Sequence, residues 1–308
     1  MRADVYSRAE LFAGLDAEAA FSYTETRDFQ IYRHFVSEGR SVARNPYVGM
    51  MQALHDNAIT QAAQGILSGR RVAAIMGSHR MRRDVAAYRD VARLARRLTR
   101  SGVCVSSGGG PGAMEACHLG AAFATQVDAA LDAAFDVLAR APVVPELGAI
   151  VAADGSIDAG LVVEAHRWMA PAHTLAARLD TPGESLGIPT WHYGHEPTSP
   201  FATHVAKYFQ NSIREEGLLA VAQQGVVFGE GRAGTIQEIF QDAAQNFYRS
   251  FDHASPMVLL GTRHWTETYP VLDVLRKLFA EADFQKYVLI TDDLDEAAAF
   301  IETFKSST

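Results

Sequence analysis

Short apolar runs alternate with longer helical patterns from residue 71 to the end of the chain. The runs are rich in β-branched residues, which is typical of strands. The pattern predicts strands at Val72 to Met76, Val103 to Ser107, Leu186 to Trp191, Gly225 to Phe228, Pro256 to Leu260 and Tyr287 to Ile290. Strands that alternate with helices form βαβ units, so we expect an α/β fold. Specifically, we expect a Rossmann-like, doubly wound and mostly parallel sheet with helices on both faces.

Three segments, two between predicted strands and one after the last strand, repeat apolar residues with helical spacing, which predicts amphipathic helices that cover the sheet. In the first, which we expect to end at Ser101-Gly102, the apolar positions are Val91, Leu94, Ala95 and Leu98. In the second they are Ile236, Ile239, Phe240, Ala243 and Phe247. The third runs from Leu294 to Phe304.

Two regions depart from this alternation. Residues 1–70 predict an N-terminal helical extension whose last helix runs from Tyr47 to Leu67. We expect that helix to dock on the sheet through Met50, Met51, Leu54 and Ile59. Residues 71–308 predict a Rossmann-like nucleotide-binding domain with an insert at about 125–183. The insert contains an Asp154-Gly155 turn, and it is too long for a simple crossover, so it is a candidate lid or oligomer contact.

Composition narrows the class of protein. The 308 residues are 48% hydrophobic and 21% charged, which suffices for one large α/β domain or two ordinary ones. A formal net charge of -8 argues against a nucleic-acid partner, which normally needs a basic face. Cys104 and Cys117 show no disulfide pattern. We see neither a signal peptide nor an apolar stretch long enough to cross a bilayer, so we expect a cytoplasmic protein with no membrane partner.

Two glycine-rich turns each follow a predicted strand and precede a predicted helix. They are Ser106-Ser-Gly-Gly-Gly-Pro-Gly-Ala-Met-Glu-Ala116 and Phe228-Gly-Glu-Gly-Arg-Ala-Gly-Thr-Ile-Gln-Glu238. Backbone N–H groups freed by glycine, together with the positive end of a helix, form a site for a phosphate or carboxylate. Gly77 and Ser78 end the first strand on the same rim of the sheet, where α/β proteins bind ligands.

The sequence lacks the motifs that mark several common nucleotide, metal and cofactor sites. No ribose-binding acid follows at the dinucleotide-binding spacing, and neither glycine turn is followed by Lys-Ser or Lys-Thr. His192 and His195 form a His-x-x-His pair without a third ligand of defined spacing, so we expect no metal site. Neither glycine turn holds a lysine for pyridoxal phosphate, and we expect no cofactor.

The two glycine turns resemble motifs of the Lonely Guy (LOG) family, often labelled lysine decarboxylase-like. Gly108-Gly-Gly-Pro-Gly-Ala-Met-Glu115 resembles that family's Gly-Gly-Gly-x-x-Gly-x-Met motif, and Gly231-Arg-Ala-Gly-Thr-Ile-Gln-Glu238 resembles its Pro-Gly-Gly-x-Gly-Thr-x-x-Glu motif. Asn211-Ser-Ile-Arg-Glu-Glu216 occupies the place of its arginine-bearing helix. The segment Pro256-Met-Val-Leu-Leu-Gly261 resembles the strand that comes next. The likeness covers roughly residues 70–124 and 184–305.

The resemblance implies hydrolysis of the N-glycosidic bond of a nucleoside 5'-monophosphate, with release of a free base and ribose 5-phosphate, by a homodimer or higher homo-oligomer. It implies that Glu238 is the catalytic carboxylate, and that Arg214 stabilises charge on the leaving base or holds the ribose phosphate. The expected contacts to substrate or phosphate are Gly77, Ser78, Gly108, Gly109, Gly110, Gly112, Met114, Glu115, Gly231, Arg232, Gly234 and Thr235.

Glu230 and Arg232 depart from the family pattern, which has proline and glycine at these positions. Arg232 either adds a phosphate contact or occupies the site, and Glu230 weakens an anion site unless Arg232 pairs with it. A second hypothesis therefore stays open. It is a non-catalytic protein that binds a nucleotide or a phosphorylated cofactor, like the molybdenum-cofactor carriers that share this fold, or a nucleotide sensor. The sequence does not specify the base.

Overall fold

The computed structural model describes residues 2–251 and 254–305. Within them, seven strands form one sheet in the order β4-β3-β2-β1-β5-β6-β7, and all neighbouring strands pair in parallel. The strands are β1 (Val72–Met76), β2 (Cys104–Ser107), β3 (Ser185–Gly187), β4 (His204–Val205), β5 (Gly225–Phe228), β6 (Met257–Leu260) and β7 (Val288–Thr291). The predicted α/β class with a Rossmann-like, doubly wound parallel sheet is confirmed.

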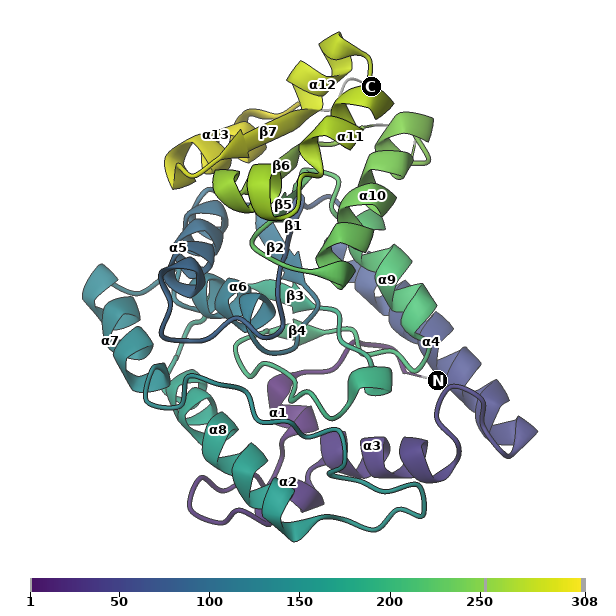
Figure 1. Cartoon of the computed structure of the whole chain (residues 1–308). Helices are drawn as coiled ribbons and strands as arrows, with labels where there is room; N and C mark the ends of the chain where they lie inside the picture. The colour runs from purple at the N-terminus through teal and green to yellow at the C-terminus, as the bar shows by residue number, and fades with distance from the viewer. Residues whose placement is uncertain (1, 252–253, 306–308) are drawn as a thin grey trace.

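Helices cover both faces of the sheet (Figure 1), with α5, α6 and α13 on one face and α9 and α10 on the other. The N-terminal helices α1 to α3 lie with α8 beyond β4. The helices are α1 (Arg8–Leu11), α2 (Ser22–Glu25), α3 (Arg27–Ser37), α4 (Pro46–Leu67), α5 (Ala86–Arg100), α6 (Ala113–Ala122), α7 (Asp128–Leu138), α8 (Ala159–Ala177), η1 (Trp191–Tyr193), α9 (Asn211–Ala220), α10 (Ala233–Tyr248), η2 (His264–Thr268), α11 (Leu272–Leu278), α12 (Glu281–Tyr287) and α13 (Leu294–Thr303).

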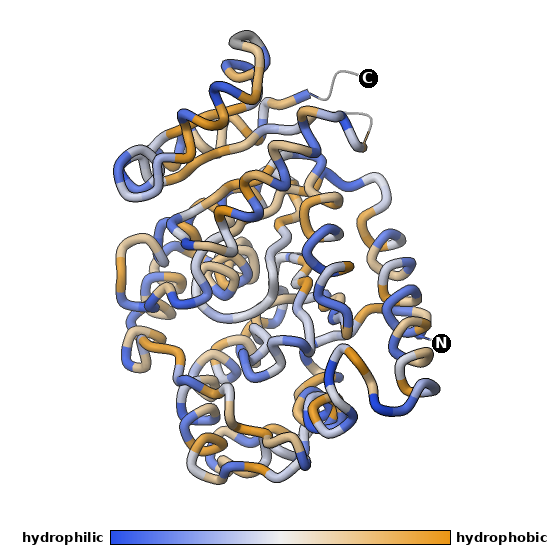
Figure 2. The backbone as a smooth tube through the Cα atoms, turned by 45° about the vertical axis from the view of Figure 1, so that its right-hand side comes forward, coloured by the Kyte–Doolittle hydropathy of each residue, from blue (hydrophilic) through white to orange (hydrophobic). Residues whose placement is uncertain are grey.

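The sheet is buried on both faces because successive strand residues point to opposite sides. In β1, Ala73 and Ile75 join the hydrophobic core beneath α5 and α6. Ala74 and Met76 join the core beneath α9 and α10. Figure 2 shows these strands as an apolar centre with hydrophilic positions on the outer helices. Burial on both faces explains why the strands have nearly continuous apolar sequences.

The three predicted amphipathic helices correspond to α5, α10 and α13. All four predicted apolar positions of α5 are buried. Gly102 follows α5 with a φ of 80°, which suits a glycine at the end of a helix. In α10, Ile239 and Ala243 are buried, but Phe247 is half exposed, so the prediction for that last position is wrong.

The third predicted strand, Leu186 to Trp191, is only partly correct. Strand β3 ends at Gly187, and Trp191 begins the 3-10 helix η1. Pro189 explains the early end, because proline has no N–H to donate to a neighbouring strand. Strand β4 was not predicted, because it has only two residues and therefore shows no alternation. The other five predicted strands agree with the structure to within one residue at each end.

Helix α4 matches the predicted Tyr47 to Leu67 helix, but its predicted docking face is mostly wrong. Met50, Met51 and Leu54 are 54%, 60% and 42% exposed, and of the predicted docking residues Ile59 is the one that is buried. The first half of α4 projects from the body of the protein (Figure 1). Apolar side chains in that half therefore have no sheet to cover.

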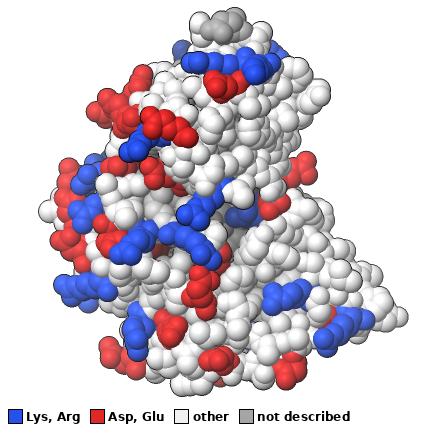
Figure 3. All heavy atoms as spheres, in the orientation of Figure 1, with Lys and Arg blue, Asp and Glu red and all other residues white. Residues whose placement is uncertain are grey.

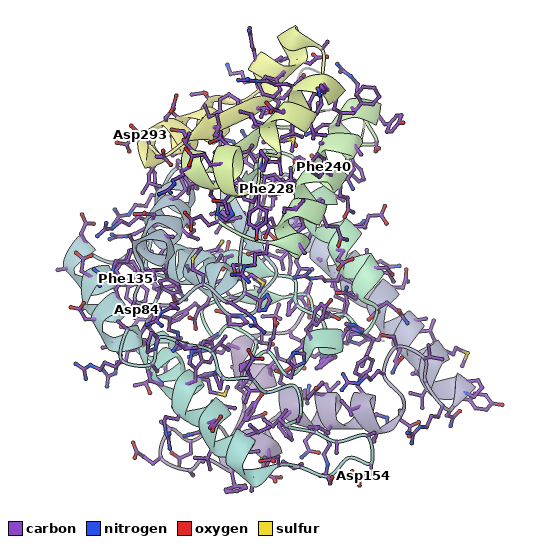
Figure 4. All side chains as sticks on the ribbon, in the orientation of Figure 1. Asp84, Phe135, Asp154, Phe228, Phe240 and Asp293 are labelled. Atoms are coloured by element: carbon purple, nitrogen blue, oxygen red, sulfur yellow. The ribbon has the colours of Figure 1, made fainter. Side chains whose placement is uncertain are left out.

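The N-terminal helices and the insert share the core beneath α9 and α10. Phe29 and Phe35 of α3 are buried in that core, as are Trp168 and Met169 of α8. The predicted turn in the insert is present, and Asp154 lies there at the edge of the molecule, whereas Phe228 lies in the interior (Figure 4). These regions are therefore packed into the same body as the sheet.

A buried ion pair ties α3 to the segment that follows β4. Lys207 Nζ lies 2.6 Å from Asp28 Oδ1 and donates a hydrogen bond of 2.8 Å to Thr198 Oγ1. Both charged side chains are almost completely buried. Burial lowers the pKa of Lys207, and the negative charge of Asp28 opposes that shift. Among the described helices, none is both long and apolar enough to span a membrane.

Candidate functional site

Three predicted loops meet where the order of the sheet reverses. Strand β1 pairs with β2 on one side and with β5 on the other, so the loops after these three strands share one edge. Ser78 N donates a 3.0 Å hydrogen bond to Glu230 O, and Ala113 N donates one of 3.0 Å to Ser78 O. Open α/β sheets bind ligands at such a reversal, so this edge is the candidate site.

The glycines after β2 allow other groups to approach closely. A Cβ on Gly108 would lie 2.1 Å from Arg214 Nη2 and 2.5 Å from Met114 Sδ. Gly109 packs against the ring of Pro189. Gly112 has a φ of 70°, and a Cβ there would lie 2.3 Å from Ser78 O. This loop therefore needs glycine for packing within the protein, in addition to any approach to a ligand.

We expect Gly112→Ala to lower the free energy of unfolding by about 1–3 kcal/mol, because alanine is strained at this φ and collides with the loop after β1. Urea unfolding measures the change. Gly234→Ala is the matched control at the start of α10, since among the described residues a Cβ at Gly234 meets no atom within 4 Å. Equal losses of stability in both variants would contradict this explanation.

The loop after β5 presents an uncapped helix N-terminus. No side chain caps α10, whose N-cap residue is Arg232. Thr235 is 4% exposed and its hydroxyl faces Gly231, where a Cβ would lie 2.1 Å from Thr235 Oγ1. In the described part of the chain that hydroxyl forms no hydrogen bond. Free N–H groups and a free hydroxyl at a helix start can bind a phosphate.

The two residues that depart from the family pattern do not neutralise each other. Within residues 2–251 and 254–305, no ion pair joins Glu230 to Arg232, and both residues are exposed. The Glu230 side chain instead lies near Gly261, where a Cβ would be 3.4 Å from Glu230 Cγ. His264 Nε2 lies 2.8 Å from Gly231 O. Arg232 is thus exposed at the start of α10.

In the predicted pair, Arg214 of α9 lies close enough to Glu238 of α10 for its positive charge to act on the Glu238 carboxyl group. Arg214 Nε donates a 2.9 Å hydrogen bond to Ile188 O, which holds the guanidinium over Gly108. Burial raises the pKa of Glu238 to about 7, while the positive charge of Arg214 opposes the shift and the negative charge of Glu215 adds to it. No carboxylate of the described residues forms an ion pair with Arg214, so its remaining N–H groups can reach a ligand.

A second acid lies deeper in α10. Asp242 is 3% exposed, its Oδ2 lacks a hydrogen-bond partner in the described part of the chain, and burial raises its pKa to about 8. The unfolded chain therefore loses this proton at lower pH than the folded protein does. The contribution of Asp242 to the free energy of unfolding is fully present below pH 4, and it is lost as the pH rises toward about 8.

Asp242→Asn should consequently make the protein more stable than the wild type at pH 8, because asparagine resembles the protonated acid and carries no charge. Urea unfolding from pH 5 to pH 8 measures this effect. The exposed Asp273→Asn is the control, and it should leave the pH dependence unchanged. The prediction would be contradicted if the difference in free energy of unfolding between the wild type and Asp242→Asn stayed constant from pH 5 to pH 8.

Glu196 lies in the site, although no motif in the sequence identified it. A Cβ on Gly110 would lie 3.3 Å from Glu196 Oε2, and Glu196 Oε1 is 3.9 Å from His79 Nε2. Burial raises the pKa of Glu196, and the charges of His79, Arg214 and Arg80 oppose the shift, whereas that of Glu146 adds to it. In the sequence, the feature that could have indicated Glu196 as a site residue is its position in a loop after the third predicted strand.

Asp56 of α4 was also not predicted, and it holds the start of the helix that carries Arg214. Its carboxylate is fully buried and accepts hydrogen bonds of 2.9 Å from Phe209 N and 2.9 Å from Gln210 N. Gln210 is the N-cap of α9, so an acid of the N-terminal region caps the helix that carries Arg214. Nothing in the local sequence around Asp56 indicates this contact.

Glu115 differs from the other predicted contacts because internal partners use both of its oxygens. Arg83 donates hydrogen bonds of 2.6 and 2.7 Å to it, and Tyr88 donates one of 3.0 Å. Arg83 and Glu115 are both 1% exposed, so we leave Glu115 out of the proposed ligand contacts.

On the face shown in Figure 3, acidic and basic side chains are interspersed. Among the described residues, no cluster of three or more His, Cys, Asp or Glu side chains could hold a metal ion.

Comparison with known proteins does not extend this picture. No model of a protein family matches the chain, and no curated protein matches it. The fold and the geometry of the strand-end site therefore carry the functional argument.

Proposed function

We propose that this protein hydrolyses the N-glycosidic bond of a nucleoside 5'-monophosphate and releases a free base and ribose 5-phosphate. The observation that carries the proposal is the electrostatic interaction of Arg214 with Glu238 beside two glycine loops at the reversal of the sheet. The resemblance of those loops to LOG family motifs supports the same reaction.

The loop after β5 suits the phosphate. The uncapped start of α10 offers N–H groups, Thr235 offers a hydroxyl, and the exposed Arg232 offers a cation. Gly77 and Ser78 border this loop through the hydrogen bond from Ser78 N to Glu230 O. Binding the phosphate here fixes the distant glycosidic bond relative to the catalytic side chains.

Glu238 suits the activation of water. A carboxylate whose pKa is about 7 takes a proton more readily than an ordinary glutamate, and it is largely ionised just above neutral pH. The transition state resembles an oxocarbenium ion, which a nearby carboxylate stabilises. Arg214 provides fixed donors for the leaving base or for the ribose phosphate.

Incubation with AMP, GMP, IMP, CMP and UMP, followed by chromatography of the products, tests the proposal. We expect release of free base and ribose 5-phosphate from at least one of them. Absence of base release from all five at high enzyme concentration would reject the hydrolase.

The exposed charge of Glu230 at the mouth of the loop favours the second hypothesis, a non-catalytic binder or sensor of a phosphorylated ligand. This hypothesis expects strong thermal stabilisation by a nucleotide without any release of base. The homo-oligomeric state and the cytoplasmic location remain predictions from the sequence, and size-exclusion chromatography with light scattering tests the first.

A further inference from the structure

Glu196 has no internal partner that accounts for its position in the site. It is 21% exposed, and in the described part of the chain its carboxylate oxygens accept no hydrogen bond. Among the described residues, the one basic side chain within ion-pair distance is the half-exposed His79, whose Nε2 lies 3.9 Å from Glu196 Oε1, so this pair adds little stability. A half-buried carboxyl group without a hydrogen bond over a glycine loop is suited to a ligand contact.

The loop that carries Glu196 is held firmly against the site. Ser199 N donates a 2.8 Å hydrogen bond to Gly109 O, and Glu196 N donates one of 2.8 Å to Tyr193 O. Gly194 packs against the ring of Tyr32 from α3, so closely that a Cβ would lie 2.2 Å from that ring. These contacts fix the Glu196 side chain over Gly110.

Glu196 and Glu238 reach the site from different elements. Glu238 comes from α10, beside the loop after β5, and Glu196 comes from the loop after η1, above the loop after β2. The positive charge of Arg214 acts on both carboxyl groups. Enzymes that cleave glycosidic bonds commonly use two such carboxyl groups, one toward the water and one toward the leaving group.

We propose that Glu196 is a further catalytic residue, the general acid that protonates the leaving base, and this inference rests on the proposed hydrolase function. The alternative within the same geometry is a purely structural acid that holds the loop. Removing a structural acid would slow the hydrolysis of all nucleotides equally. Removing a general acid would slow hydrolysis most for the nucleotides whose leaving base needs a proton.

The reaction balances with water as the co-reactant. The bond between ribose C1' and the base nitrogen breaks, its electron pair stays with the base, and the base takes the proton of the Glu196 carboxyl group. Water oxygen forms the new bond to C1', and the carboxylate of Glu238 takes a proton from that water. Transfer of this proton through solvent from Glu238 to Glu196 restores both groups.

The groups around Glu196 act on its carboxyl group in both directions. His79, Arg80 and Arg214 favour the ionised form, whereas burial and Glu146 favour the protonated form, and the net effect raises the pKa. Because the acid must be protonated and the base Glu238 must be ionised, kcat/KM is expected to rise and then fall with increasing pH.

The test compares GMP with 7-methylguanosine 5'-monophosphate, whose cationic base leaves without a proton at N7. We expect Glu196→Gln to lower kcat for GMP by about 10²-fold or more and to lower it much less for the methylated nucleotide. The variant should also lose the fall of kcat/KM at high pH, measured on whichever nucleotide the wild type hydrolyses fastest. Glu164→Gln, an exposed change on α8, is the matched control and should behave like the wild type.

If Glu196→Gln lowers kcat equally for both nucleotides and leaves the pH profile unchanged, Glu196 is not the general acid. The proposed hydrolase function would not be contradicted by that result. Wild-type activity in Glu196→Gln would lead to the same conclusion. A wild-type enzyme that releases base from no nucleotide would instead reject the hydrolase and this inference with it. Circular dichroism and urea unfolding of Glu196→Gln separate these results from a failure to fold.

Discussion

Replacing Glu238 with glutamine is expected to lower kcat for base release by about 10²- to 10⁴-fold, while nucleotide affinity changes little. Glutamine keeps the shape of the side chain, but it cannot accept the proton of the attacking water. The loss should therefore appear in kcat and not in KM. Steady-state kinetics on the fastest nucleotide, with affinity measured by calorimetry, check both parts.

The pH profile gives this prediction a sharper form. Wild-type kcat should rise with pH as Glu238 ionises near pH 7. Glu215→Gln is the informative control, because Glu215 adds to the raised pKa of Glu238 and its removal should move that rise to lower pH. Full activity in Glu238→Gln would contradict the proposed role, and nucleotide binding without any turnover in the wild type would favour the binder or sensor.

Replacing Lys207 with methionine is expected to lower the free energy of unfolding by about 3–5 kcal/mol. Methionine fills the space of the lysine stem but leaves the Asp28 carboxylate buried without its counter-charge. Urea unfolding at pH 7 measures the loss. The same variant should loosen the loop that carries Thr198 and Glu196, because Lys207 Nζ bonds to Thr198 Oγ1.

Two controls isolate the cost of the unpaired charge. Adding Asp28→Asn to the methionine variant removes the buried charge and should restore part of the stability. Arg263→Met breaks the exposed Arg263 and Glu267 pair, with 3.2 Å between Nε and Oε2, and should cost less than about 1 kcal/mol. Similar losses in Lys207→Met and Arg263→Met would show that the buried pair contributes no more than a surface pair.

The sequence predicted those parts of the fold that depend on local pattern. Continuous apolar runs located five strands, since a parallel sheet buries both faces of each strand. The topological rule for strand ends then predicted that the loops after β1, β2 and β5 would meet. The pairing of Arg214 with Glu238 came from the resemblance, and in the structure the positive charge of Arg214 acts on Glu238 against the burial that raises its pKa.

The missed features depend on contacts between distant parts of the chain. Asp56 lies 153 residues from Phe209, and neither local sequence indicates the other. The apolar residues near the start of α4 follow a helical pattern, but a pattern cannot indicate whether a partner surface exists within the chain. Glu196 lies in a segment without periodicity, and its place in the site depends on its approach to the neighbouring glycine loop.

The cap that Asp56 places on α9 determines how short a fragment of this protein can be if it is to keep Arg214 in place. A fragment that starts at β1 would keep every glycine loop, Arg214 and Glu238, yet the N–H groups of Phe209 and Gln210 would lose their acceptor. Its arginine-bearing helix would then fray at the end nearer the arginine. The smallest unit that holds the arginine in place therefore begins before α4, although the resemblance to the LOG motifs starts only at about residue 70.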